Sequence, residues 1–417
     1  MKTYPATVGQ LSVWRDIEKM PPGRSWEANL TFVWDLPPDA PAQEADVWRA
    51  LARLALRHGS LRTRYVVDDA GMPRQWLCED GEAGILEQIR QGTADVAERA
   101  GLEERELQRA IDVTRELPWR AWLLLDGPRP AQVLVIVNHM AADGAAALVM
   151  RDDFLRLLGG EELPAAPGPL EMALEQQEDG GGRLRTAERY WRRTLAAAPR
   201  LADGAGEPER VGATLHTGVP MPDAHEAAAK LGVSLASVLL TAYHRALRAA
   251  TGEGTHLLFP MSSNRYDERN ASLVTSLNQW VPLLVDLDPA EPFDAAAGRT
   301  HWKSFNALKN GVCSPDAIVA IRAEHADADP GYYYNPILAP PGFPSQDAPA
   351  PATVEWYEPA RTTGPGFYLI ARGLTSLDLI LRVNRPGWDR PRVESFLHAI
   401  AGELSPIGVA QPAAMLT

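Results

Sequence analysis

The sequence predicts an α/β protein of two lobes, each a mixed sheet covered by helices. Helical periodicity and strand-like apolar runs alternate in both halves of the chain. A segment rich in proline and glycine separates the halves between residues 159 and 182. The length of 417 residues suits two cores better than one. We therefore expect lobes at 1–165 and 183–417, joined by a linker at 166–182.

In the first half, helices with one apolar face alternate with strands rich in β-branched and aromatic residues. We expect helices at 10–18, 44–56 and 94–113. The expected strands are 29–36, 63–67, 75–78, 121–125 and 131–137. The second and third of these strands resemble a hairpin across Asp68-Asp69-Ala70-Gly71.

The second half repeats this alternation with longer helices. The expected helices are 183–198, 224–230, 235–250, 295–310 and 392–404. The expected strands are 255–260, 279–286, 332–335, 366–371 and 377–383. A proline-rich loop is expected at 337–351.

One predicted strand ends in residues that can carry chemistry. The run from Val133 to Val137 is apolar, as in a strand covered on both faces, and His139 follows it. A base at an exposed strand end can meet a substrate. Asp143 would hold the following turn, and Gly144 would leave space that a side chain would otherwise crowd. The alternative is a structural histidine, with Asp143 as an ordinary helix N-cap.

Composition excludes several classes of function. The net charge of -13 argues against a nucleic-acid partner, which needs a basic surface. Cys78 and Cys313 lack metal-ligand spacing, so neither a disulfide framework nor a cysteine metal site is expected. The N-terminus lacks an apolar signal core, and no stretch approaches the ~20 apolar residues of a membrane span. We expect a cytoplasmic protein that binds no membrane.

Five segments together resemble the condensation domains of nonribosomal peptide synthetases, which belong to the chloramphenicol acetyltransferase-like superfamily. The opening TVGQLSVW is similar to the family's Ser-x-Ala-Gln-x-x-x-Trp, and NHMAADG is similar to its His-His-x-x-x-Asp-Gly. The five segments are residues 7–14, 57–65, 138–144, 190–195 and 277–286. The resemblance implies two acetyltransferase-like lobes with a substrate tunnel between them.

The departures from the family pattern are few. Asn138 stands where the family has its first histidine, whereas His139 keeps the position of the catalytic one. Gly59 replaces a usual glutamate, and Leu284 stands where arginine is common. The chain lacks the Asp-Phe-Gly-Trp-Gly of plant-type acyltransferases and the aspartates of heterocyclising relatives. It keeps the histidine that the oxygenase-recruiting relative has lost.

The resemblance implies acyl transfer from a carrier-protein thioester to a small-molecule amine or alcohol, with His139 as the base. It implies an acyl or peptidyl carrier protein as partner and its phosphopantetheine arm as substrate carrier. No tightly bound cofactor and no metal are expected, and we expect a monomer.

The other candidate site residues follow from the same resemblance. Asp143 would pair with Arg265 from the second lobe, and Asn138 and Gly144 would also be structural. Asn278 and Trp280 would line the tunnel, although core packing is the alternative for Trp280. A solvated loop charge is the alternative for Arg265. We expect a carboxylate partner for a buried Arg62.

Two other functions stay open. One is an acyltransferase that uses coenzyme A thioesters or releases a carrier-bound chain. The other is a degenerate domain retained as a docking platform, which the changes at Asn138, Gly59 and Leu284 favour.

Overall fold

The chain forms two compact units in a computed structural model that describes residues 2–38, 43–178, 181–200, 208–341 and 352–404. Unit 1 comprises Met1–Arg185, Ser263–Gln279 and Val312–Pro315. Unit 2 comprises Thr186–Ser262, Trp280–Gly311 and Asp316–Thr417. The segment Ser263–Gln279, which the sequence placed in the second lobe, therefore folds with unit 1.

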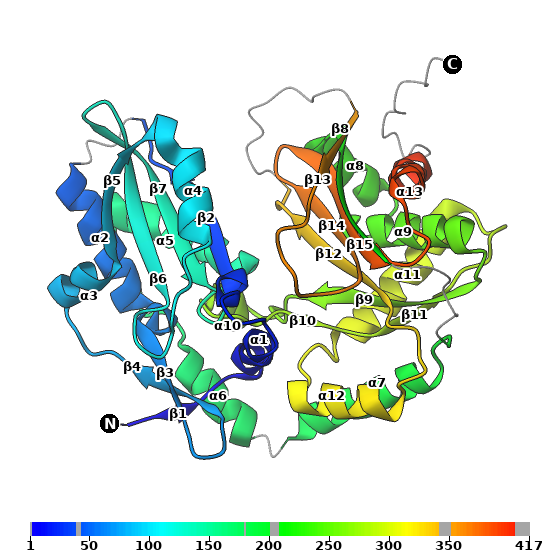
Figure 1. Cartoon of the computed structure of the whole chain (residues 1–417), viewed down its shortest axis with the longest axis horizontal. Helices are drawn as coiled ribbons and strands as arrows, with labels where there is room; N and C mark the ends of the chain where they lie inside the picture. The colour runs from blue at the N-terminus through cyan, green and yellow to red at the C-terminus, as the bar shows by residue number, and fades with distance from the viewer. Residues whose placement is uncertain (1, 39–42, 179–180, 201–207, 342–351, 405–417) are drawn as a thin grey trace. The chain divides into compact units, whose positions relative to one another are not determined.

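Unit 1 contains a four-stranded sheet in the order β2-β7-β6-β5 and a three-stranded sheet in the order β1-β4-β3 (Figure 1). The strands are β1 (Tyr4–Pro5), β2 (Asn29–Asp35), β3 (Thr63–Val67), β4 (Pro73–Leu77), β5 (Arg90–Asp95), β6 (Trp119–Asp126) and β7 (Arg129–Asn138). The helices are α1 (Val8–Glu18), α2 (Glu44–Arg57), α3 (Glu82–Ile89), α4 (Arg99–Leu107), α5 (Gly144–Leu158), α6 (Pro169–Glu178) and α10 (Glu268–Ser272).

Strand β7 is covered on both faces, as its continuous apolar run predicts. Val133, Val135 and Val137 pack into a core with helices α2, α3 and α5. The alternate residues Leu134 and Ile136 pack into a second core with α4, and α1 borders this core. Because successive side chains point to opposite faces of a strand, both cores fix the end of β7, where His139 follows.

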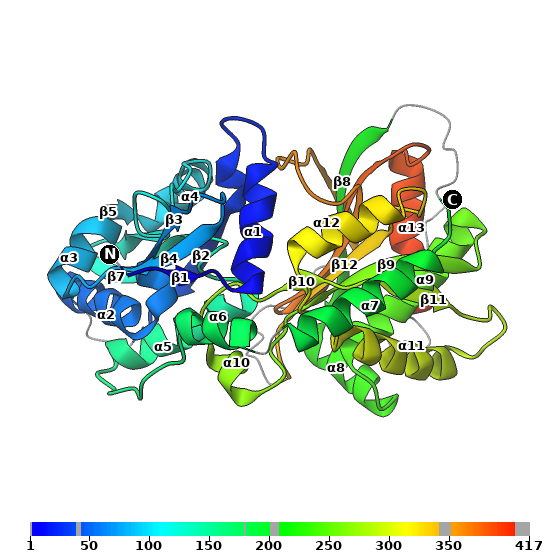
Figure 2. The same ribbon diagram turned by 90° about the horizontal axis from the view of Figure 1, so that it is seen from below.

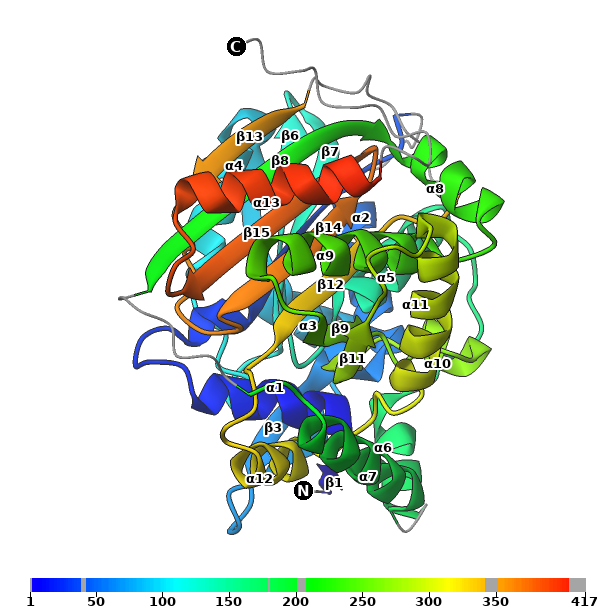
Figure 3. The same ribbon diagram turned by 90° about the vertical axis from the view of Figure 1, so that its right-hand side faces the viewer.

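Unit 2 contains a mixed sheet of eight strands in the order β10-β9-β12-β14-β15-β8-β13, with β11 paired to β9. The strands are β8 (Glu209–Pro220), β9 (Thr255–Ser262), β10 (Gln279–Trp280), β11 (Leu283–Asp286), β12 (Tyr332–Leu338), β13 (Thr353–Tyr357), β14 (Phe367–Gly373) and β15 (Ser376–Arg385). The helices are α7 (Gly182–Ala196), α8 (Met221–Lys230), α9 (Leu235–Thr251), α11 (Phe293–Leu308), α12 (Pro315–Glu324) and α13 (Arg390–Glu403). Helices α9 and α13 lie across one face of this sheet (Figure 3) and share its core.

Several elements differ from the sequence prediction. The helix expected at 94–113 is shorter in the structure, where α4 covers Arg99–Leu107. Strand β5 extends to Asp95, and a 3-10 turn at Val96–Glu98 lies between this strand and the helix. The linker at 166–182 contains α6, whose Met172 packs with Leu273 and Leu277. A proline at the first position of α6 starts the helix rather than breaking it.

Strand β8 was missed because glycine and threonine interrupt its apolar pattern. A Cβ atom at Gly212 would lie 2.8 Å from the backbone oxygen of Tyr357 on β13, so the close pairing of these strands requires glycine. Helix α12 and strand β13 were also missed, and neither has a strong apolar pattern.

Arg62 pairs with no carboxylate among the residues that the structure describes, contrary to the expectation. Its guanidinium donates to the backbone oxygen of Cys78 at 3.0 Å. A carboxylate contact of this kind is made earlier in the same segment. Arg57 and His58 both bind the Asp153 carboxylate of α5, at 2.7 and 2.8 Å. This buried contact fixes the end of α2 against α5.

None of the helices within the described ranges is both long enough and apolar enough to cross a bilayer.

Candidate active site

The backbone at the end of β7 is fixed by hydrogen bonds on both sides of His139. The His139 N–H donates to the Ala28 oxygen at 2.7 Å, and the Asn138 N–H donates to the Pro118 oxygen at 2.7 Å. The Ala141 N–H then donates to the Asn138 oxygen at 2.9 Å, which closes the turn. His139 is half-buried, so its backbone is held in place while part of the residue stays accessible to solvent.

Asn138 is a structural part of this turn. Its side chain is 1% exposed, and its Oδ1 accepts the Met140 N–H at 3.0 Å. In histidine, the Nδ1 atom occupies the place that Oδ1 occupies in asparagine, one bond beyond Cγ. Asparagine therefore supplies the same acceptor as a neutral histidine at this position.

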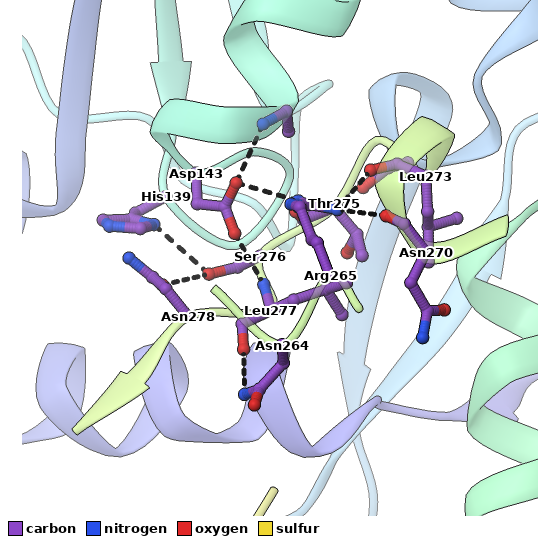
Figure 4. A network of polar contacts seen from close by, with 12 residues as sticks. His139, Asp143, Asn264, Arg265, Asn270, Leu273, Thr275, Ser276, Leu277 and Asn278 are labelled. Carbon is purple, nitrogen blue, oxygen red and sulfur yellow. Dashed lines mark hydrogen bonds and ion pairs between the residues drawn. The ribbon is translucent and has the colours of Figure 1, made fainter. Parts of the chain in front are cut away.

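Asp143 joins three parts of unit 1 through its carboxylate (Figure 4). Its Oδ1 accepts the Ala146 N–H at 2.9 Å, which caps α5, and the Arg265 guanidinium at 2.8 Å. Its Oδ2 accepts the Leu277 N–H at 2.9 Å. With 2% of the side chain exposed, these bonds compensate for the loss of hydration.

Arg265 organises the segment that carries residues 270–277. Its Nη1 donates to the backbone oxygens of Asn270 and Leu273, both at 2.8 Å. Its Nη2 donates to Asp143 and to the backbone oxygen of Thr275 at 2.9 Å (Figure 4). The side chain is 6% exposed, which excludes a solvated loop charge.

Ser276 contacts the imidazole directly. Its Oγ lies 3.3 Å from His139 Nδ1 and 3.2 Å from Asn278 Oδ1 (Figure 4). The amide oxygen of Asn278 accepts only, so the hydroxyl donates to Asn278 and is left to accept from an Nδ1–H. This arrangement favours the His139 tautomer that is protonated at Nδ1, in which Nε2 carries the lone pair.

Helix α1 holds the Ser276 segment against this turn. Gln10 is fully buried, and its Nε2 donates to the Thr275 hydroxyl at 3.2 Å. A Cβ atom at Gly9 would overlap the backbone oxygen of Ser276 and lie 2.9 Å from Leu277 Cα. Glycine at this position therefore permits the close approach of α1 to the segment.

One carboxylate of α1 interacts electrostatically with His139. Surrounding protein displaces water and raises the pKa of Asp16, whereas the charges of Lys19 and His139 lower it. The Asp16 side chain is nevertheless 68% exposed, so solvent screens this interaction.

The structure brings most of the sequence-predicted site residues together. Those in one network of unit 1 are Asn138, His139, Asp143, Arg265 and Asn278. Trp280 lies in unit 2, on β10, where its ring packs edge-on against Tyr333 at 4.9 Å and Tyr368 at 5.4 Å.

A side chain at position 144 would not clash with the rest of the described protein, so packing does not require glycine there. A Cβ atom at this position would meet no atom within 4 Å. The space beside the first turn of α5 is open, and Gly144 is exposed.

Sequence reasoning missed Gly9, Thr275 and Ser276. Gly9 was part of a recognised motif, but its contact partner is more than 260 residues away and has no local signal. Thr275 and Ser276 are buried in the structure, but they lie in a loop before β10, and no local sequence pattern marks them. In the described part of the chain, no group of three or more His, Cys, Asp or Glu side chains has a metal-binding arrangement.

Comparison with known proteins identifies the family. A family model described as Condensation domain matches residues 23–310. Surfactin synthase subunit 1 of Bacillus subtilis (strain 168) is 23% identical over 273 residues, which cover 63% of this chain and 7% of that protein. Cyclosporin synthetase simA of Tolypocladium inflatum is 30% identical over 189 residues, which cover 42% of this chain and 1% of that protein. The chain thus spans a small fraction of these synthetases.

Solved structures show the same fold. The condensation domain of the enacyloxin polyketide synthase has a TM-score of 0.79 at 18% identity, covering 100% of this chain and 84% of that chain. At this identity the likeness concerns the fold alone, and it confirms the predicted α/β class. Because the family model covers more than half of the sequence, the chain belongs to the condensation-domain family, whose members are acyltransferases that form amide bonds.

Proposed function

We propose that this chain transfers an acyl or aminoacyl group from a carrier-protein thioester to an amine, with His139 as the general base. The observation that carries the proposal is the contact of Ser276 with His139 Nδ1, at 3.3 Å. It leaves Nε2 as the basic atom of a half-buried ring.

In the proposed reaction, the acceptor nitrogen attacks the thioester carbonyl while Nε2 of His139 takes a proton from it. The C–N bond forms, the C–S bond breaks, and the phosphopantetheine thiolate receives the proton from the imidazolium. Thioesters need little activation, so the protein chiefly aligns the two substrates and moves one proton. An unperturbed imidazole, with a pKa of about 6.5, exchanges a proton readily near neutral pH.

The proposed roles of the other residues follow their contacts. Asp143 and Arg265 hold the Ser276 segment beside His139, and Asn138 fixes the turn. Asn278 orients the Ser276 hydroxyl and is also our candidate substrate contact. The two aromatic neighbours of Trp280 support core packing rather than substrate contact.

The partners in this proposal are an acyl or peptidyl carrier protein and a small amine or alcohol, and the enzyme acts as a monomer. The phosphopantetheine arm of the carrier delivers the substrate, and no tightly bound cofactor or metal takes part.

Chain release is a second candidate function. The enacyloxin synthase domain, whose fold is similar, is reported to mediate chain release from that synthase. By analogy, this chain would pass a carrier-bound acyl group to a soluble alcohol or amine. The same His139 chemistry applies to both acceptors.

The test uses purified protein, carrier proteins encoded beside this gene and mass spectrometry of the products. Each acyl group is presented once on the carrier and once on coenzyme A, with amine and alcohol acceptors in separate reactions. We expect product from the carrier thioester and its loss in His139→Ala. Product from coenzyme A alone would favour a coenzyme A-dependent transferase. Equal product from His139→Ala would remove the catalytic role of His139, and no product from any donor would favour a docking platform.

A further inference from the structure

The mixed sheet of unit 2 has one face that helices α9 and α13 do not cover. Both helices lie on the same side of strands β8 and β12, to their right in Figure 2, and the residues that point to this side form the core of the unit. Because side chains alternate along a strand, the residues between those core residues form a second surface. We call it the outer face, and it includes Thr214, Tyr333, Tyr368, Ile380 and Arg382, which are absent from that core.

A row of aromatic side chains crosses the outer face and contains one cation. Strand pairing puts Tyr333 of β12 beside Tyr368 of β14, and Tyr368 beside Arg382 of β15. The Arg382 guanidinium lies 4.6 Å from the centre of the Tyr368 ring. On its other side Arg382 is paired with Gly212 of β8, and the Tyr357 ring of β13 fills the space where a Gly212 side chain would lie. Tyrosine rings therefore flank the Arg382 charge on both sides.

The Arg382 charge acts on both of these phenols. Burial raises the pKa of Tyr368, against a hydrogen bond from Asn335 and the charge of Arg382, which lower it. Burial also raises the pKa of Tyr357, and the Arg382 charge again acts in the opposite direction. The guanidinium is thus within electrostatic reach of both rings.

Arg382 pairs with no carboxylate among the residues that the structure describes, although it is half-buried. Asp378 lies on the same face of β15, four residues earlier, but its carboxylate binds Arg372 and His216, both at 2.9 Å. Contact with an aromatic ring does not use up the five N–H donors of a guanidinium. The planar fork of these donors matches the two oxygens of a carboxylate. An anionic group of a ligand would therefore complete the surroundings of Arg382.

We propose that Arg382 binds the carboxylate of a free apolar amino acid on the outer face, and that this amino acid is the acceptor of the acyl group. The inference rests on the proposed function, which requires an amine acceptor. The amino acid supplies this amine: its C–N bond forms, the C–S bond of the carrier thioester breaks, and the thiolate receives the proton. The carboxylate stays unchanged and serves only in binding.

The acceptor in this proposal is soluble rather than carrier-bound. An amino acid on a carrier has no free carboxylate, because that group forms the thioester. The tyrosine rings beside Arg382 offer apolar surface to the side chain of the amino acid. Trp280, which packs edge-on against Tyr368 at 5.4 Å, follows the candidate substrate contact Asn278 by two residues in the chain.

Direct binding tests the proposal without any need for turnover. The unmodified chain is titrated with phenylalanine, tyrosine, tryptophan and leucine and with the carboxamide of each, and ligand-detected NMR gives the Kd. Phosphopantetheine is titrated as well, because its phosphate is the other anion that Arg382 could bind. Each amino acid should bind more tightly than its carboxamide, on the order of tenfold for the preferred one. This comparison requires no variant.

Three variants then assign the effect to one side chain. Arg382→Met removes the charge with little change of length, and Arg382→Lys keeps the charge without the bidentate fork. Arg372→Met is the matched control, because it removes the same charge from the outer face of the neighbouring strand β14, where Arg372 is 47% exposed. Urea unfolding checks that each variant is folded.

We expect the Kd for the preferred amino acid to rise on the order of tenfold in Arg382→Met, less in Arg382→Lys, and within twofold in Arg372→Met. The Kd for the carboxamide should not rise in any of them. In turnover assays with an acyl-carrier, KM for the amino acid should rise in Arg382→Met while kcat changes less than twofold. The reason is that the carboxylate contact is equally strong in the ground state and the transition state.

Three results would overturn the proposal: none of the four amino acids binds the unmodified chain, each amino acid and its carboxamide bind alike, or Arg382→Met weakens the binding of phosphopantetheine alone. If the amino acid binds through Arg382 but no acyl group is transferred to any acceptor, the binding site stands and the proposed function fails. If amino acid and carboxamide are acylated alike and Arg382→Met leaves both KM values unchanged, the proposed function stands and Arg382 has only its contact with Tyr368.

Discussion

Asp143 and Arg265 are 122 positions apart in the chain, yet their side chains form a buried ion pair of 2.8 Å. Arg265 also donates to three backbone oxygens of residues 270–275, and Asp143 accepts the backbone N–H of Leu277. The pair is thus the centre of a network that attaches the 263–279 segment to unit 1. Because Ser276 belongs to this segment, the ion pair helps to hold the Ser276 hydroxyl beside the His139 imidazole.

Asp143→Ala tests this network. The change removes the N-cap of α5 and leaves the Arg265 charge buried without its partner, so we expect a loss of about 3–5 kcal/mol in the free energy of unfolding. Urea unfolding measures it. Removal of an exposed partner in Arg49→Ala is the control and should cost below about 1 kcal/mol. A well-folded Asp143→Ala protein with only a changed KM would contradict the structural role.

Ser276→Ala tests the orientation of the imidazole. Without the hydroxyl, His139 loses the acceptor at Nδ1, and its ring and tautomer are less restricted. We expect kcat to fall about tenfold, equivalent to about 1.4 kcal/mol, with KM nearly unchanged. Ser272→Ala is the matched control, because Ser272 lies in the same segment and, among the described residues, its hydroxyl bonds to the Arg269 backbone oxygen and not to His139. Unchanged kcat in Ser276→Ala would remove the positioning role.

Two substitutions of Asn138 test whether its role is structural or chemical. Asn138→His should keep both stability and activity, since Nδ1 of a neutral imidazole can accept the Met140 N–H in place of Oδ1. Asn138→Leu leaves this buried N–H without an acceptor and should cost about 1–3 kcal/mol in unfolding free energy. Full stability of Asn138→Leu would show that the 3.0 Å contact contributes little.

Gly9→Ala addresses the contact between α1 and Ser276. The added methyl group would overlap the Ser276 oxygen, and relief of the overlap requires backbone movement beside His139. We expect a loss of about 1–3 kcal/mol in stability together with lower kcat. Gly101→Ala in α4 is the control, because a Cβ there meets no atom within 4 Å. That change should instead stabilise the protein by about 0.5–1 kcal/mol.

The sequence predicts local features of this protein better than its long-range contacts. The β7 strand, its histidine and the cap at Asp143 follow from patterns within about ten neighbouring residues. The position of Ser276 does not, because it depends on Gly9 and on the Asp143–Arg265 pair, which join distant segments. For the same reason, residues 263–279 were assigned to the second lobe, since chain order alone carries no sign that they return to unit 1.

Two buried histidines of unit 2 make stability depend on pH. His244 and His256 meet edge-on at 5.1 Å and are 0% and 3% exposed. Burial, and then the neighbouring His256, lowers the pKa of His244 to about 3, and burial lowers the pKa of His256 to about 4. At these two positions the unfolded chain therefore binds more protons than the folded chain below pH 6.5, and their contribution to stability falls as the pH falls through this range.

Between pH 7 and pH 5, each histidine should cost about 2 kcal/mol of unfolding free energy. Urea unfolding of unit 2 at the two pH values measures the sum, together with the contribution of any other groups that titrate in this range. His244→Leu isolates one contribution, because it removes the titrating ring with little change of volume and should alter stability at pH 7 by less than about 1.5 kcal/mol. In this variant the difference between pH 7 and pH 5 should shrink by about 2 kcal/mol. An unchanged difference would show that water reaches the His244 ring in the folded state and that burial does not lower its pKa.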